Sequence, residues 1–144
     1  MVDRFEQFVS LIDRIYRNIQ KIERSEMERY GLKGSYAQYL LAMRRFPQGI
    51  TAAQLCEICG KDKAAVSRAV SEMEPRGLIS RDGSTYRSVL RLTPEGGHAA
   101  QYVCSKATAA MELAGISDND REMLYTTLTQ IAGNLELICK EGIE

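Results

Sequence analysis

Two cysteines three residues apart, Cys56 and Cys59, are the residues that most directly suggest chemistry in this sequence. A Cys-x-x-Cys pair serves redox exchange or metal binding, but reactive pairs lie at helix N-termini, where the helix dipole stabilises a thiolate. Here both thiols fall in the later half of a predicted helix. A zinc site needs two more ligands, and only His98, Cys104 and Cys139 remain, with nothing to bring them together. We therefore predict core packing for the pair and no metal or cofactor.

The chain also carries the composition of a soluble globular protein, with 44% apolar and 26% charged residues in 144. The N-terminal residues MVDRFEQF do not form a signal peptide, and the apolar runs are too short to span a bilayer. We therefore expect a cytoplasmic protein whose cysteines are free thiols. Cys104 and Cys139 lie on predicted terminal helices, where oxidation sensing is a second interpretation.

The strongest functional pattern is the stretch 51–77, TAAQLCEICGKDKAAVSRAVSEMEPRG. It predicts two short amphipathic helices about three residues apart. Thr51 with Gln54 forms a capping box at the first helix, Gly60 ends it, and Asp62 is a good N-cap for the second. This layout is typical of a helix-turn-helix, in which the second helix enters the DNA major groove.

One face of that second helix has the composition of a DNA-reading surface. Its members are Ala64, Ser67, Arg68 and Ser71, opposite a predicted buried side of Val66, Ala69, Val70 and Met73. The small residues let the backbone approach DNA, the serines suit base edges or phosphates, and Arg68 can reach guanine or a phosphate. An i,i+4 ion pair with Glu72 is the alternative role for Arg68.

Charge is distributed unevenly although the net charge is zero. Residues 61–91 hold seven basic and four acidic side chains, a net charge of +3, and the remainder carries −3. Such a basic stretch fits contact with phosphates. The candidates are Lys61 and Lys63 near the helix N-terminus and Arg81, Arg87 and Arg91 downstream. Each of the three arginines could instead be a solvated surface charge that contacts no nucleic acid. We expect Arg76 to support a neighbouring carboxylate or the wing, the short β-hairpin that is predicted just downstream.

The surrounding elements are predicted to hold and pair this unit. A helix over 3–29 carries a heptad stripe, and a second helix begins at Ser35, a plausible N-cap, and ends near Arg45. A strand over 78–81, an Asp82-Gly83 turn and alternation over 85–92 predict a short β-hairpin. Helices over about 94–113 and from Ser117 follow. The stripes are Phe5, Phe8, Ile12, Ile15, Ile19 and Ile22 near one end and Leu124, Leu128, Ile131, Leu135 and Ile138 near the other. A partner helix and the chain's own core remain equal explanations for such a stripe.

The order of elements and several strings resemble the MarR-type winged helix-turn-helix repressors. The strings are Gly49-Ile50-Thr51 with Leu55, Asp62-Lys63-Ala64-Ala65-Val66-Ser67-Arg68, Gly77-Leu78-Ile79 with Arg81, and Arg91-Leu92-Thr93-Pro94-Glu95-Gly96. The fold class is therefore expected to be mainly α with a small β-wing. The resemblance implies a helical dimerisation region at residues 1–34 and 95–144 and a winged helix-turn-helix domain at residues 35–94.

The resemblance implies a function as well. Members of the family are homodimers that bind pseudo-palindromic DNA, the wing reaching flanking backbone or minor groove. Many release DNA when a small, often aromatic, effector binds between the dimer region and the winged helix, and others respond to cysteine oxidation. The helices that would line this effector cleft contribute Tyr16, Tyr36, Tyr39, Met43, His98 and Tyr102, for which ordinary packing is the alternative. The first helix has no cysteine, which argues against a peroxide sensor.

Two features depart from the family pattern. The wing is short, and Asp82 with Arg87 is the nearest equivalent of the Asp-x-Arg pair that often braces the hairpin. Pro75 stands where the family usually continues its recognition helix, which predicts an early end to that helix.

We therefore expect a homodimeric transcriptional regulator, a repressor, that binds double-stranded DNA and no membrane. A winged helix that binds protein is the second hypothesis; the small-residue face with its arginine and the basic wing favour DNA. No nucleophile–base pair, carboxylate pair or phosphate loop is evident in the sequence, so we do not expect an enzyme.

Overall fold

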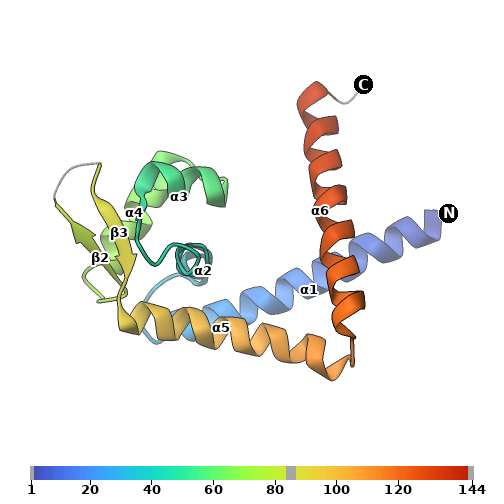
Figure 1. The fold of residues 1–144 in the computed structure, drawn as a ribbon, viewed down its shortest axis with the longest axis horizontal. Coiled ribbons are helices and arrows are strands. Elements are labelled where there is room, and N and C mark those ends of the chain that lie inside the picture. The colour runs from blue at the N-terminus through green and yellow to red at the C-terminus, as the bar shows by residue number, and fades with distance from the viewer. Residues whose placement is uncertain (1, 84–86, 143–144) are drawn as a thin grey trace. The chain divides into compact units, whose positions relative to one another are not determined.

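The computed structural model describes residues 2–83 and 87–142 (Figure 1). Its elements, in chain order, are α1 (Val2–Glu28), the 3-10 turn η1 (Gly34–Tyr36), α2 (Ala37–Met43), β1 (Ile50–Thr51), α3 (Ala52–Cys59), α4 (Lys63–Met73), β2 (Ile79–Asp82), β3 (Val89–Leu92), α5 (Pro94–Leu113) and α6 (Asp118–Glu141). The chain divides into two compact units, Met1–Ala107 and Thr108–Glu144. The predicted fold class, mainly α with a small β-wing, is confirmed. The division into dimerisation and DNA-binding regions stays a prediction.

The core of the first unit is built around α2, a helix of only seven residues. Three of its large side chains, Tyr39, Leu40 and Met43, are almost fully buried. They belong to one apolar cluster with side chains from the end of α1, from α3 and α4, and from the strands; its largest members outside α2 include Met27, Ile50, Leu55, Val66, Met73, Leu78 and Leu90. This shared core fixes α3 and α4 relative to the wing.

The wing is part of a three-stranded antiparallel sheet in the order β1–β3–β2. Ile50 pairs with Leu90 and Ile79 pairs with Leu92, so the apolar side chains of all three strands reach the core. The two-residue strand β1 was not predicted, because a segment that short shows no alternation. The predicted strand over 85–92 begins only at Val89 in the structure, and residues 85–86 of that prediction lie outside the described residues.

The two helix-turn-helix elements begin and end where the sequence predicts. Thr51 accepts from the backbone of Gln54 in a capping box, and Gly60 closes α3 in the left-handed region at φ 61°. The Asp62 carboxylate accepts from the Ala65 amide at 2.7 Å and caps α4. Local capping thus sets the turn between the helices.

The start of the second helical segment differs from the prediction. Ser35 is not an N-cap: the segment opens as η1 after Lys33, and α2 follows Tyr36 without a side-chain cap. The reason lies in packing against α1, since a Cβ atom at Gly34 would stand 2.9 Å from the Arg24 Cα atom. The backbone of this turn is therefore fixed by its approach to α1 rather than by a serine cap.

The heptad stripes are largely exposed within each unit taken by itself. In the N-terminal half of α1, Phe5 is 70% exposed and Ile15 is 57% exposed, whereas Met27 near the C-terminal end is buried. Helix α6 has no buried residue, and its Leu135 and Ile138 are about half exposed. Many apolar side chains of the two stripes are therefore not buried by other residues of their own unit.

The apolar residues of α3 are not all buried: Leu55 is fully buried, whereas Ile58 is 39% exposed and lies outside the core. Across the described residues, no helix is both long enough and apolar enough to cross a membrane.

The first turn of α5 passes very close to the strand side of the core, which gives a test of the fold. A Cβ atom at Gly96 would lie 2.0 Å from the Leu78 carbonyl oxygen, whereas one at Gly97 would meet nothing within 4 Å. We predict that Gly96→Ala lowers the free energy of unfolding by about 1–3 kcal/mol or more, because the backbone at Leu78 or in α5 would have to move to make room for the methyl group. The matched Gly97→Ala should be stabilising by about 0.5–1 kcal/mol through helix propensity. Urea unfolding of both variants measures the difference, and equal stabilities would contradict this packing.

Candidate nucleic-acid interface

Helix α4 separates cleanly into a buried and an exposed side. Its predicted buried residues are confirmed: Val66, Ala69, Val70 and Met73 are at most 3% exposed. The opposite side presents Ala64, Ser67, Arg68 and Ser71 to solvent. These four residues form what we call the α4 face. It is polar and flat apart from one long side chain, a surface that another molecule's backbone can approach closely.

The side chains next to Arg68 are arranged so that its guanidinium is not paired on its own helix. Among the described residues, no ion pair joins Arg68 to Glu72, the partner proposed as the alternative to DNA. Glu72 instead accepts a hydrogen bond from the Tyr36 hydroxyl. The Ser71 hydroxyl donates to the Arg68 carbonyl oxygen at 2.8 Å, which leaves its oxygen lone pairs available.

The Tyr36 hydroxyl is largely enclosed, since the residue is only 7% exposed. Burial and the hydrogen bond to Glu72, together with the charge of Glu72, raise the pKa of Tyr36 to about 12. The positive charge of Arg68 acts in the opposite direction and lowers that pKa, so Arg68 lies within electrostatic reach of the same hydroxyl. Tyr36 and Glu72 thus form a hydrogen-bonded pair at the edge of the core, and the charge of Arg68 acts on that pair.

Two lysines flank the start of α4. Both Lys61 and Lys63 are exposed, on either side of the capping residue Asp62. The first turn of α4 holds no acidic side chain, so the two ammonium groups and the helix amide groups are opposed only by the Asp62 carboxylate that caps the helix. Lys61 also lines a groove described below.

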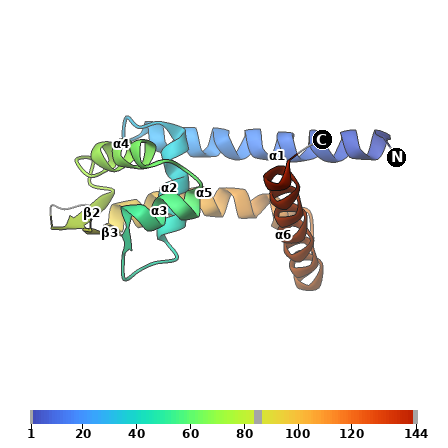
Figure 2. The ribbon, with the colours of Figure 1, turned by 90° about the horizontal axis from the view of Figure 1, so that it is seen from above.

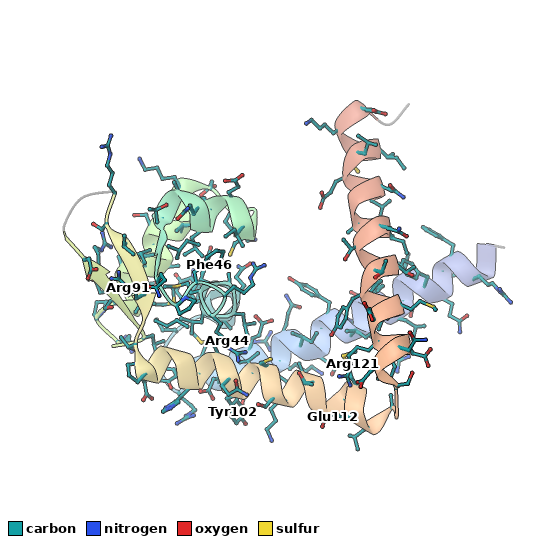
Figure 3. The ribbon with its side chains drawn as sticks, viewed as in Figure 1. Arg44, Phe46, Arg91, Tyr102, Glu112 and Arg121 are labelled. Atoms are coloured by element: carbon teal, nitrogen blue, oxygen red, sulfur yellow. The ribbon has the colours of Figure 1, made fainter. Side chains whose placement is uncertain are left out.

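The three wing arginines predicted to contact nucleic acid have different surroundings. Arg81 approaches Glu74 at 3.7 Å, and Arg91 pairs with Asp82 across the two strands. Arg87 is exposed and has an interaction of its own. The predicted match of Asp82 with Arg87 as the bracing pair is therefore replaced by Asp82 with Arg91, whose position on β3 Figure 3 shows.

Arg76 has a different role from the one predicted. It was expected to support the wing or a carboxylate, but it donates to the backbone carbonyl of Tyr30, just beyond the end of α1. This bond joins the segment after α4 to the segment after α1. Figure 2 shows α4 and the C-terminal end of α1 at the same end of the unit. A carbonyl at a helix end lacks an intrahelical partner, and a nearby guanidinium can supply one.

The six residues predicted to line an effector cleft are brought together only in part. Tyr36, Tyr39 and Met43 are buried in the core, and His98 is exposed on α5. Tyr102 is 41% exposed and points from α5 away from α2 (Figure 3). Its ring lies 5.5 Å from the Lys106 ammonium.

Only Tyr16 of that set lines a groove of about 620 Å³. The groove lies along α1, η1 and the start of α2, and its other lining residues are Gln20, Glu23, Arg24, Lys33, Gly34, Ser35, Gln38, Leu41 and Lys61. Burial raises the pKa of Glu23 on its floor. Sequence reasoning missed the basic residues of this groove, because they come from three separate segments without a shared spacing.

The cysteine pair behaves as predicted. Cys56 and Cys59 are half-buried and pack against the core cluster, and burial raises the pKa of the Cys59 thiol above its ordinary value. A raised pKa disfavours the reactive thiolate. In the described part of the chain, no group of three or more His, Cys, Asp or Glu side chains could hold a metal ion.

Comparison with known proteins identifies this architecture. Residues 30–85 match the MarR family. A MarR transcriptional regulator from Methanosarcina mazei Go1 superimposes with a TM-score of 0.71 at 21% identity, covering 92% of this chain and 99% of that one. A MarR-family regulator from Listeria monocytogenes, solved with a 26mer DNA, gives 0.70 at 23% identity over 94% and 95%. The MepR–DNA complex of S. aureus gives 0.66 at 18% identity over 88% and 96%. Among curated protein sequences, none matches this chain.

The raised pKa of Tyr36 predicts a specific loss of stability in alkali. The folded state keeps this hydroxyl protonated up to about pH 12, whereas an unfolded tyrosine ionises near 10.0. Its contribution is therefore present below pH 10 and is lost as the pH rises towards 12. Urea unfolding at stepped pH should show a steeper fall for the wild type than for Tyr36→Phe over that interval. Parallel curves for the two proteins would refute the link between this hydroxyl and stability.

Proposed function

Because the chain has the fold of the MarR-family regulators and its residues 30–85 are of that family, we propose that it is a sequence-specific DNA-binding transcriptional regulator. It acts as a homodimer on a pseudo-palindromic operator and represses transcription. The α4 face enters the major groove of one half-site, and the wing lies against the flanking backbone. The single observation that carries the proposal is the exposed α4 face, on which small and hydroxyl side chains surround an arginine that has no ion-pair partner among the described residues.

Each part of the α4 face has a defined role in this proposal. Arg68 contacts a base edge or a phosphate, and Ser67 and Ser71 bond to base edges or phosphates. Ala64 keeps the helix close to the groove. Lys61 and Lys63 sit near the N-terminus of α4 and bind phosphates. Two solved proteins of the same fold were determined with DNA, which supports this use of the fold.

The wing contributes less than α4 in this proposal. Arg81 and Arg91 already face carboxylates, and each would have to leave or share that partner to reach a phosphate. Arg87 is exposed and also has an interaction of its own, so we propose it as a wing contact on the same footing as the other two.

The proposed dimer follows from the exposed apolar stripes. In the N-terminal half of α1, Phe8 and Ile12 are 37% and 42% exposed along one side of the helix, and Leu135 and Ile138 are exposed on α6. A soluble chain rarely leaves such rows uncovered, and a second copy of the chain would bury them. Pairing of the copies sets the distance between the two α4 faces, and therefore the half-site spacing.

A small-molecule effector is compatible with the groove along α1. It combines the ring of Tyr16 with the positive charges of Arg24, Lys33 and Lys61, which outnumber the single carboxylate of the lining, Glu23, so the groove suits an aromatic anion. Tyr36, Tyr39 and Met43 lie behind this region in the core, while His98 and Tyr102 stay predicted contacts on α5. Oxidation of Cys104 or Cys139 is the second candidate signal.

A winged helix that binds protein is the alternative function. It would be favoured by large apolar side chains on the exposed side of α4. The α4 face has none, so DNA is the partner we propose.

The first test concerns Arg68. We predict that Arg68→Ala weakens binding to the operator by about 1–3 kcal/mol, because a base contact is lost. Fluorescence polarisation against DNA from the chain's own upstream region, repeated over a salt series, measures both affinity and the number of phosphates engaged. Arg17→Ala is the matched control, since Arg17 pairs with Asp13 on α1, away from the α4 face. Unchanged affinity of Arg68→Ala at physiological salt would remove Arg68 from the interface, and no binding by wild type at low salt would reject the proposed function.

The second test concerns the apolar stripe of α1. We predict that Ile12→Asp combined with Ile15→Asp converts the dimer to monomer, because two charges would be buried against the partner helix. Light scattering after size-exclusion chromatography measures the mass, and the monomer should lose operator affinity. Ser10→Asp adds a charge on the opposite side of α1 and should leave the dimer intact. A dimer that tolerates both aspartates on the stripe would exclude this surface from the interface.

A further inference from the structure

The hydrogen bond between Tyr36 and Glu72 connects two segments that the sequence separates by 36 residues. Tyr36 ends the turn η1, and Glu72 lies in the last turn of α4. The tyrosine is 7% exposed and is held by the core, whereas the glutamate is exposed. The donor is therefore fixed and the acceptor is the side chain that is restrained.

Without this restraint, Glu72 has another natural partner. It follows Arg68 by four residues on the same helix, the spacing at which acidic and basic side chains form ion pairs. That pair is absent among the described residues, although Arg68 is close enough to act electrostatically on the Tyr36 hydroxyl. The carboxylate faces the tyrosine instead of the guanidinium.

We propose that Tyr36 is a positioning residue for DNA recognition: its hydroxyl holds the Glu72 carboxylate away from Arg68 and leaves the guanidinium available to DNA. This inference rests on the proposed function. Loss of the hydroxyl would let Glu72 pair with Arg68, and DNA would then have to compete with that carboxylate for the arginine.

The position of Tyr36 gives the restraint a second property. The residues before it, Lys33, Gly34 and Ser35, line the groove along α1. The turn that forms the groove wall therefore also carries the hydroxyl that restrains Glu72. A shift of this turn would be felt at the α4 face through one hydrogen bond.

The test uses the full-length protein and a double-mutant cycle. Tyr36→Phe keeps the ring in the core and removes only the hydroxyl. It should weaken operator binding by about twofold, the factor of an i,i+4 ion pair. The loss should disappear in the Arg68→Ala background, where there is no guanidinium to capture. It should also disappear in the Glu72→Gln background, because the amide cannot form the ion pair.

Tyr30→Phe is the matched control. The Tyr30 hydroxyl donates to the Glu95 carboxylate at 2.9 Å, so this variant also removes one tyrosine–glutamate hydrogen bond, but away from α4. It should bind the operator as tightly as the wild type. An equal loss in Tyr30→Phe would mean that the effect of Tyr36→Phe is a general loss of stability.

A second readout needs no DNA. The side-chain Nε–H signal of Arg68, assigned by its absence in Arg68→Ala, should shift in the NMR spectrum of free Tyr36→Phe and return in Tyr36→Phe with Glu72→Gln. An unmoved signal, or a Tyr36→Phe loss of affinity that persists in Arg68→Ala, would overturn the positioning role while wild-type binding keeps the proposed function intact. A shifted signal in a protein that binds no DNA would instead overturn the proposed function and, with it, the role in recognition.

Discussion

Burial of the short helix α2 is the constraint on which the rest of the first unit depends. Tyr39, Leu40 and Met43 contribute to a core shared by the end of α1, the two helix-turn-helix elements and the strands. A seven-residue helix has little stability of its own. Helix α2 is stable because its neighbours enclose it. Packing around α2 in turn sets the orientation of those neighbours. Because Val66 and Met73 are buried in this core, the opposite side of α4 faces solvent.

The same arrangement explains why polar contacts gather at the margin of that core. Tyr36 precedes α2 and donates to the Glu72 carboxylate, which would otherwise compete for Arg68. Arg76 follows α4 and donates to the Tyr30 carbonyl, which would otherwise remain unpaired. Hydrogen bonds to charged groups of this kind add about 1.5–3 kcal/mol each to stability. They also act on geometry, because they decide which groups on α4 and just after it are already occupied.

Much of the candidate interface could be predicted from local patterns. The split of α4 into a buried and an exposed side follows from its helical period, and the caps at Thr51, Asp62 and Ser117 follow from residue type and spacing. The heptad stripes were evident, and so was the packing role of Cys56 and Cys59. These features need only information within about one helical turn. The residue types on the exposed side suggest that it binds DNA, and binding experiments decide whether it does.

Most helices, the helix-turn-helix and the composition of the α4 face can be predicted from local patterns, because each depends on residues close together in the chain. Which charges pair depends instead on contacts between distant segments. Asp82 faces Arg91 because two antiparallel strands bring them together, and Glu72 faces Tyr36 because the turn after α1 packs beside α4. The tertiary structure also decided that the turn begins at Gly34 rather than at a Ser35 cap, because the backbone of α1 is too close for a side chain. Long-range contacts of this kind leave no periodic trace in a single sequence.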